Sequence, residues 1–249
     1  EEGHFILRKH TDNKEIYIHF NAAPLGYLSI AAHGHSDALS FIMHLNGKKI
    51  LVDCGTFSYH THPDWRQYFI GTLAHNTLRI NKRNQALNGG PTLWLRHYET
   101  SVKEIISNDK YDKVAANHDG YKKLGIMHAR ELILDKVDNT VLINDFITCK
   151  SGKEYFIEFP LHLHPDILIK KQDNYISILD NNKNLIMKIF SDRSFNTTII
   201  KGEKSPIMGW YSDSFYKKEP TNMIYQTMKI NSSTSIKTKI SISFNNIIF

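Results

Sequence analysis

Hydrophobic and polar residues alternate with a period of two along most of this chain. Residues 15–20, for example, are Glu-Ile-Tyr-Ile-His-Phe. Successive side chains of a strand point to opposite faces, so this alternation predicts strands with one buried face. Segments of this kind, rich in Ile, Val, Phe, Tyr and Thr, are 15–20, 39–45, 49–52, 92–98, 131–134, 140–146, 155–159, 175–179, 185–189, 223–230 and 233–244.

Turn-forming residues separate these segments. Asn46-Gly47 is the pair that a two-residue type I′ hairpin turn favours. Many short strands divided by turns are typical of an antiparallel sandwich. We therefore predict an all-β fold, an antiparallel multi-stranded β-sandwich with few short helices, in which residues 1–249 form a single domain. The one helical segment expected is 63–69, and the polar stretch 108–123 is expected to be a surface excursion.

The composition narrows the class of protein. The chain has 249 residues, of which 41% are hydrophobic, enough for a full core. No apolar run approaches the length of a membrane-spanning helix. A net charge of +6 favours anionic partners, but the lysines form scattered pairs and no nucleic-acid-binding motif accompanies them. The two cysteines, Cys54 and Cys149, are too few for a disulfide framework, so we expect free thiols.

The chain contains 14 histidines, and two of them, His33 and His35, stand on either side of a glycine. A two-residue turn at Asn46-Gly47 would pair residues whose numbers sum to 93, which places Asp53 opposite Ser40. A straight chain would carry His35 about 17 Å beyond Ser40. The segment before Ser40 must therefore bend back for His35 to meet Asp53.

Two imidazoles and one carboxylate on separate pieces of backbone suit Zn²⁺ and related divalent ions. His75, just before a strand-like run, is a candidate for the remaining ligand. The alternative is that these histidines only pack or hydrogen-bond at strand ends. Two histidines and a carboxylate also describe the iron site of non-haem oxygenases, so that class stays open as well.

Other candidate residues carry weaker signals. His60 and His62 lie in a predicted loop and form either a second metal pair or an exposed pair. His162 and His164 alternate along a predicted strand and are expected to line the core or a cleft. The tryptophans serve either as sugar-stacking platforms or as core residues: Trp65, Trp94 and Trp210.

An ordered set of motifs resembles the heparinase II/III-like family of bacterial polysaccharide lyases. The motifs cover nearly the whole chain, and the set is more specific than any one of them. They are His33-Gly34-His35-Ser36-Asp37-Ala38-Leu39-Ser40-Phe41, Val52-Asp53-Cys54-Gly55-Thr56, Trp65-Arg66-Gln67-Tyr68-Phe69, Ala74-His75-Asn76-Thr77, Gly90-Pro91 with Leu93-Trp94, Leu161-His162-Leu163-His164-Pro165 and Gly209-Trp210-Tyr211-Ser212.

The resemblance implies an architecture and partners. Enzymes of this family join an N-terminal α/α toroid to a C-terminal β-sandwich region, and this chain resembles the C-terminal part of such a two-domain protein. The implied partners are an anionic polysaccharide and an N-terminal toroid of the same protein. Nucleic acid and a membrane span are not expected. A periplasmic or secreted location is implied as well.

The resemblance also implies residue roles. His35, Asp53 and His75 resemble the family's ligands for a divalent metal, most often Zn²⁺ and in some cases Ca²⁺. His33 resembles the histidine that faces the substrate, and Tyr68 resembles a tyrosine near the scissile bond.

Arg66 is expected to contact a carboxylate or sulfate of the substrate. The expected function is a metal-containing polysaccharide lyase that cleaves an acidic, uronate-bearing glycan, such as a glycosaminoglycan or alginate, by β-elimination. The alternatives are a non-catalytic glycan-binding or structural β-sandwich and a metal-dependent oxygenase.

Overall fold

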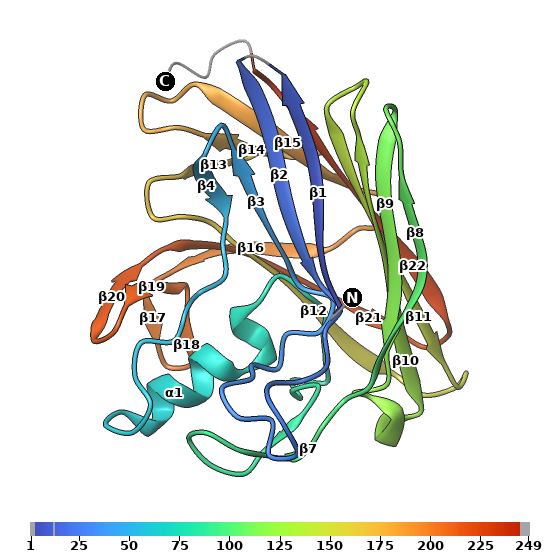
Figure 1. The fold of residues 1–249 in the computed structure, drawn as a ribbon, viewed down its shortest axis with the longest axis vertical. Coiled ribbons are helices and arrows are strands. Elements are labelled where there is room, and N and C mark those ends of the chain that lie inside the picture. The colour runs from blue at the N-terminus through green and yellow to red at the C-terminus, as the bar shows by residue number, and fades with distance from the viewer. Residues whose placement is uncertain (1–2, 12, 245–249) are drawn as a thin grey trace.

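The computed structural model describes residues 3–11 and 13–244, and antiparallel sheets make up most of it (Figure 1). One sheet has the strand order β1-β2-β3-β4. Its strands are β1 (His4–Thr11), β2 (Lys14–Asn21), β3 (Phe41–Leu45) and β4 (Lys48–Leu51).

The largest sheet has eight strands in the order β13-β14-β15-β22-β11-β10-β9-β8. Its strands are β8 (Thr100–Ser107), β9 (Tyr111–His118), β10 (Ile126–Asp135), β11 (Thr140–Cys149), β13 (Leu168–Lys171), β14 (Ile176–Leu179), β15 (Leu185–Ser191) and β22 (Thr234–Ile242).

A further four-stranded sheet has the order β16-β21-β12-β5. Its strands are β5 (Arg79–Ile80), β12 (Tyr155–His162), β16 (Asn196–Lys201) and β21 (Asn222–Ile230). Short two-stranded hairpins complete the strands: β6 (Leu87–Asn88) with β7 (Trp94–Arg96), β17 (Glu203–Lys204) with β18 (Ile207–Met208), and β19 (Trp210–Ser214) with β20 (Lys217–Pro220).

The helical part is small, as the sequence predicts. Helix α1 (Pro63–Ile70) begins with a proline, whose fixed φ suits the first turn. Its buried Tyr68 and Phe69 belong to a hydrophobic cluster separate from the sandwich core. Two 3₁₀ turns, η1 (Thr72–Ala74) and η2 (Lys122–Leu124), are the other helical elements described. None of the described helices is long and apolar enough to cross a membrane.

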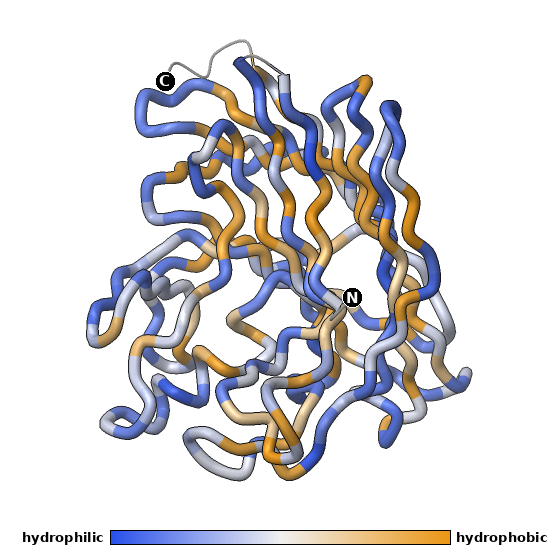
Figure 2. Tube along the Cα trace, in the orientation of Figure 1, coloured by the Kyte–Doolittle hydropathy of each residue, from blue (hydrophilic) through white to orange (hydrophobic). Residues whose placement is uncertain are grey.

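One large hydrophobic core lies between the sheets. It combines inward-facing residues of all three larger sheets, such as Phe20, Ile143 and Phe159, each with an exposed fraction of 0%. Apolar stretches run along the strands of the sandwich, whereas the turns at the strand ends are polar (Figure 2). These features confirm the predicted all-β antiparallel sandwich.

Strands β4 and β12 connect two of the sheets. Leu51 and Leu163 form an isolated antiparallel bridge, and the amide of Val52 donates to the carbonyl of His162 at 3.0 Å. The chain therefore leaves β4 along the end of β12, and the segment that follows β4 runs down toward α1 in Figure 1.

The hairpin prediction is confirmed at the turn and wrong in register further out. Asn46 and Gly47 have φ of 47° and 75°, as a type I′ turn requires. A bulge between Met43 and His44 then shifts the pairing by one residue, so Leu51 faces Met43, and the ladder ends at Leu51. Asp53 is thus carried by a loop and not by the hairpin.

The stretch 108–123 is not a surface excursion. It contains strand β9 (Tyr111–His118), which pairs with both β8 and β10. The hydrophobic pattern did not predict this strand because two of its buried positions carry polar residues, Asp112 and His118, which form polar contacts in the interior. The free thiols are confirmed, with Cys54 buried and Cys149 half-buried.

We predict that Gly55→Ala destabilises the chain more than Gly152→Ala. Both glycines have a positive φ, 84° and 83°, so each substitution forces a left-handed alanine at a cost of about 1–2 kcal/mol. At Gly55 the new Cβ would also lie 2.0 Å from the carbonyl oxygen of Ser212, whereas Gly152 has nothing within 4 Å. Urea unfolding should show an additional loss of about 2 kcal/mol at Gly55. Equal losses would show that the close approach does not matter.

Candidate metal centre

Three loops deliver His35, Asp53 and His75 to one place. His35 lies in the connection between β2 and β3, Asp53 follows β4, and His75 caps η1. Each residue offers one ligand atom, and these atoms all lie within 4.8 Å of one another. The bend that the sequence requires before Ser40 is present: the amide of Ser40 donates to the carbonyl of Asp37 at 3.0 Å, and Leu39 has a φ of 60°.

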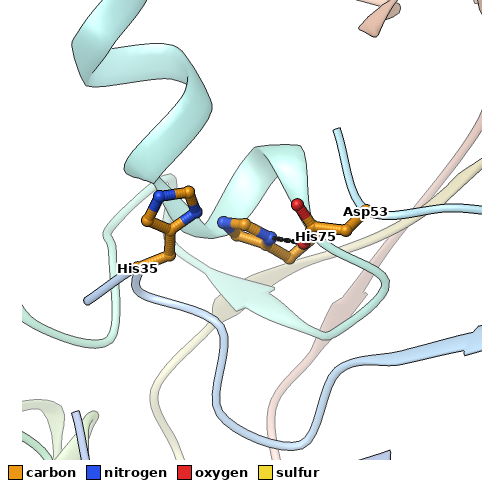
Figure 3. A group of neighbouring side chains, drawn as sticks. All are labelled: His35, Asp53 and His75. Atoms are coloured by element: carbon orange, nitrogen blue, oxygen red, sulfur yellow. Dashed lines mark hydrogen bonds and ion pairs between the residues drawn. The ribbon is translucent and has the colours of Figure 1, made fainter. Parts of the chain in front are cut away.

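His75 lies between the other two residues (Figure 3). Its Nδ1 lies 2.5 Å from Oδ2 of Asp53, and its ring centroid lies 5.3 Å from that of His35. The second oxygen of Asp53 accepts a hydrogen bond from the amide of Gly55 at 2.8 Å. His75 Nε2 is buried and has no hydrogen-bond partner among the described residues, which is unusual for a buried polar atom.

The charge states suit a cation. Burial, together with the neighbouring His75, lowers the pKa of His35 to about 3, so this imidazole is neutral at pH 7, the form that binds metals. Burial alone would raise the pKa of Asp53, but the attraction of His75 outweighs it and the pKa is lowered. Asp53 is therefore a carboxylate, and its side chain keeps 40% of its surface exposed.

The donor set fits a divalent ion. Two imidazoles and a carboxylate, with one imidazole nitrogen unpaired, are ligands that Zn²⁺ accepts readily. For all three residues to bind one ion, the proton shared by Asp53 and His75 must leave. Within the described residues this is the one group of three or more histidine, cysteine or acidic side chains whose ligand atoms lie close enough together to hold one metal ion.

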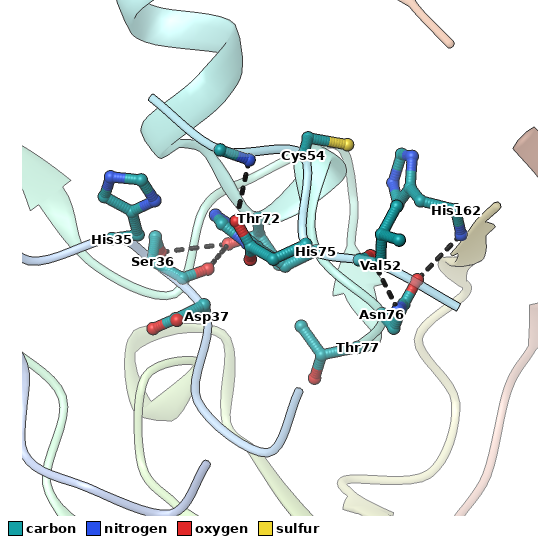
Figure 4. Close-up of polar contacts among 12 residues, drawn as sticks. His35, Ser36, Asp37, Val52, Cys54, Thr72, His75, Asn76, Thr77 and His162 are labelled. Carbon is teal, nitrogen blue, oxygen red and sulfur yellow. Dashed lines mark hydrogen bonds and ion pairs between the residues drawn. The ribbon is translucent and has the colours of Figure 1, made fainter. Parts of the chain in front are cut away.

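The side chain of Asn76 fixes the position of the neighbouring ligands (Figure 4). Its amide nitrogen donates to the carbonyls of Phe41, at 2.8 Å, and Val52, at 3.0 Å. Its oxygen accepts a hydrogen bond from the amide of His162 at 2.7 Å. One buried residue therefore connects the chain beside His75 with the chain beside Asp53 and with β12.

Hydroxyl groups hold the loop that carries His35 in the same way. Thr72 donates its hydroxyl to the carbonyl of Ser36 at 2.8 Å, and Thr77 donates to the carbonyl of Ala38 at 2.8 Å. Both threonines are buried. The loop of His35 is thus tied to the segment that carries His75.

His33 lies outside this cluster, on the exposed side of the loop. Its Nδ1 lies 3.1 Å from the hydroxyl of Tyr59, and the guanidinium of Arg66 lies 4.3 Å from the centre of the Tyr59 ring. Arg66 Nε donates to the carbonyl of Pro91 at 2.9 Å, and its Nη1 is buried and without a hydrogen-bond partner in the described part of the chain. His33, Tyr59 and Arg66 therefore form one polar and aromatic group.

Tyr68 lies in the interior. Its side chain is buried, and its hydroxyl lies 3.4 Å from the carbonyl and 3.3 Å from the amide of Trp210. The sulfur of Cys54 is 3.8 Å away. Burial raises the pKa of Tyr68 well above its usual value, so the hydroxyl keeps its proton.

The weaker candidates lie apart from the cluster. His60 and His62 are exposed, and His162 is buried and donates through Nε2 to the carbonyl of Leu73 at 2.8 Å. Trp94 and Trp210 are buried, whereas Trp65 is half-buried.

Two residues that the site depends on were not singled out by the sequence. Tyr59 lies in a loop six residues after Asp53. The one signal for it in the sequence is that it is an aromatic residue close to a candidate ligand. Asn76 directly follows His75, and a buried carboxamide between strand ends leaves no trace in the hydrophobic pattern.

The sequence of this chain is also similar to those of known proteins. A family model described as heparinase II/III-like, C-terminal, matches residues 1–240. The chain belongs to this family. Within the heparinase II/III-like family, an exo-oligoalginate lyase of Saccharophagus degradans is 26% identical over 203 residues, which are 74% of this chain and 26% of that protein.

Solved structures share the fold of this heparinase II/III-like chain. A heparinase III superposes with a TM-score of 0.77 at 18% identity over 98% of this chain. The heparan sulfate lyase HepC of Pedobacter heparinus has a TM-score of 0.76 at 15% identity over 97% of this chain. The chain spans 35% of the length of each of these two proteins.

We predict that Tyr68→Phe lowers the free energy of unfolding by about 1 kcal/mol, because it leaves the buried backbone of Trp210 without its partner. Tyr59→Phe is the matched control. Its hydroxyl bonds an exposed imidazole, so water can replace it and stability should change by less than about 0.5 kcal/mol. Urea titration checks both, and an equal loss for both variants would contradict the assignment.

Proposed function

We propose that this chain is the β-sandwich part of a metal-containing polysaccharide lyase that cleaves an acidic, uronate-bearing glycan by β-elimination. The observation that carries the proposal is the convergence of His35, Asp53 and His75, with His33 one glycine away and outside the cluster. Family membership and the names of the similar proteins, an alginate lyase and a heparan sulfate lyase, support the substrate class.

The proposed cation site consists of His35, Asp53 and His75, with Zn²⁺ as the preferred ion and Ca²⁺ as the alternative. A bound cation would fix these side chains and, through one intervening glycine, the loop that presents His33. The protein's own residues then supply the acid–base chemistry.

The reaction needs a base, an acid and a neutralising charge. The base removes the proton from the carbon next to the uronate carboxylate, and the electron pair of that C–H bond forms a carbon–carbon double bond. The bond to the 4-linked sugar oxygen breaks, its electron pair leaves with the oxygen, and an acid protonates that oxygen. Arg66 is proposed to balance the carboxylate, whose negative charge would otherwise oppose the developing enolate. Its side chain is buried, so its Nη1 would first have to become accessible to the substrate.

His33 is proposed to face the substrate and transfer a proton. The hydroxyl of Tyr59, 3.1 Å from His33, is placed to take part in the same transfer. The role suggested for Tyr68 stays a prediction, and its hydroxyl would first have to leave the backbone of Trp210.

We propose further that a complete active site needs another part of the same protein, an N-terminal α/α toroid facing this group. The solved lyases with this fold are about three times longer than the part that superposes, which supports the proposal. The full-length natural protein is therefore the sample for activity measurements.

We predict that His35→Ala and His33→Ala separate metal binding from turnover. His35→Ala should lose the bound metal and also stability, because metal binding adds to the free energy of folding. His33→Ala should keep its metal content and its melting temperature. Metal analysis after dialysis and thermal unfolding measure both, and loss of metal in His33→Ala would refute the division of roles.

We predict that the full-length protein releases unsaturated sugars from a uronate polymer. The test follows ultraviolet absorbance of the conjugated product with alginate, heparan sulfate and bacterial capsular polymers as substrates. His33→Ala should reduce the rate by about 100-fold or more. Saturable binding without any absorbance change would favour the non-catalytic glycan-binding alternative, and turnover that requires iron and oxygen would favour an oxygenase.

A further inference from the structure

A group of buried charged and polar residues lies beneath the candidate metal centre, and the proposed reaction does not use it. It consists of Arg130 and His128 on β10, Asp145 on β11 and His118 on β9, each with an exposed fraction of 0%. Charged side chains are rarely buried this deeply unless they have partners.

Arg130 donates hydrogen bonds both to a carboxylate on the neighbouring strand and to two backbone carbonyls outside its sheet. Its Nε and Nη2 donate to the two carboxylate oxygens of Asp145 at 2.7 and 3.0 Å. Its Nη1 donates to the carbonyls of Leu39, at 2.7 Å, and Asn76, at 2.8 Å. The guanidinium carbon also lies 5.7 Å from the centre of the Phe41 ring and 5.2 Å from that of the Phe159 ring.

The two carbonyls belong to the loops that carry metal ligands. Asn76 directly follows His75, and Leu39 lies four residues after His35. Leu39 has a φ of 60°, a left-handed conformation that non-glycine residues seldom adopt and that surrounding contacts must hold. Arg130 thus bridges the His35 loop and the His75 segment with a single planar group.

The two histidines of the group hold Asp145, the partner of Arg130. His128 donates through Nε2 to Asp145 at 2.7 Å, and its Nδ1 lies 3.0 Å from Nε2 of His118. Burial lowers the pKa of both imidazoles, so each is neutral and can donate from one nitrogen and accept at the other. This chain of contacts fixes Asp145 and so the plane of the Arg130 guanidinium.

A purely stabilising role explains this arrangement poorly. Replacing a buried ion pair with apolar residues is often neutral or stabilising, because desolvation offsets the attraction. Apolar residues could not form the four directed hydrogen bonds that the planar guanidinium of Arg130 donates.

We propose that Arg130 is a positioning residue of the candidate metal centre: it sets the separation of the His35 loop from His75 by holding the carbonyls of Leu39 and Asn76. The consequence for cation affinity rests on the proposed function, whereas the consequence for the contact between His75 and Asp53 does not.

Arg130→Lys tests this, with Arg79→Lys as the matched control. Lysine keeps the charge but cannot reach Asp145 and both carbonyls together. Arg79 also forms a two-point ion pair, with Glu158 at 2.7 and 2.6 Å, but none of its hydrogen bonds in the described residues goes to the loops of His35 or His75. Arg79→Lys therefore disturbs a similar ion pair but no hydrogen bond to the loops that carry the metal ligands.

The first readout needs no metal. Proton NMR of the metal-free protein follows the Nδ1 proton that His75 shares with Asp53, assigned by its absence in His75→Gln. We expect a low-field resonance in the wild type and in Arg79→Lys, and its loss or a large upfield shift in Arg130→Lys. An unchanged resonance in Arg130→Lys would overturn the proposal.

The second readout is the Co²⁺ dissociation constant from chelator competition. It should rise about tenfold or more in Arg130→Lys and less than twofold in Arg79→Lys, even if both variants lose similar stability in urea. A wild type that binds no Co²⁺ or Zn²⁺ would remove the metal from the proposed function and leave the NMR result to decide the positioning role. If Arg130→Lys does not fold, Arg130→Gln/Asp145→Asn with Arg79→Gln/Glu158→Gln replaces the pair, with the same expectations.

Discussion

The carboxamide of Asn76 is the contact on which the geometry of the site depends. Its three hydrogen bonds reach the start of β3, the residue before Asp53 and the end of β12, while its own backbone continues from His75. The ligand-bearing segments are loops, which have no ladder of their own to fix them. A single fully bonded side chain in the core therefore replaces the regularity that a sheet would supply.

The candidate ligands lie on loops, and the strands of the sandwich form the rigid scaffold that holds these loops. Residues that bind ligands often stand on loops held by a rigid scaffold. Here Arg130 on strand β10, together with Thr72 and Asn76 in the segment around His75, binds backbone carbonyls near the ligands. His33 stays exposed on the loop of His35, the half-buried Tyr59 lies beside it, and the buried Arg66 of α1 packs against the Tyr59 ring.

Much of the fold could be predicted because the period of two is strong where one strand face is apolar. The prediction failed at β9, where the buried polar residues Asp112 and His118 interrupt the apolar face. It also failed at the bulge in the β3–β4 hairpin, which the pattern of apolar residues does not encode. His35, Asp53 and His75 could be named as candidate ligands from residue types and family motifs, and the structure brings their ligand atoms within 4.8 Å of one another, although the hairpin register used to place Asp53 was wrong. Tyr59, Asn76 and Arg130 could not be predicted in the same way, because their roles depend on contacts between segments far apart in the chain.

X-ray absorption at the zinc edge, on protein loaded with one equivalent of Zn²⁺, tests the central claim most directly. Convergence of His35, Asp53 and His75 predicts a first shell of nitrogen and oxygen at about 2.0–2.1 Å, with the multiple scattering of two imidazoles and no sulfur. A sulfur shell at about 2.3 Å, which would implicate Cys54, or a shell of water oxygens alone would contradict the account.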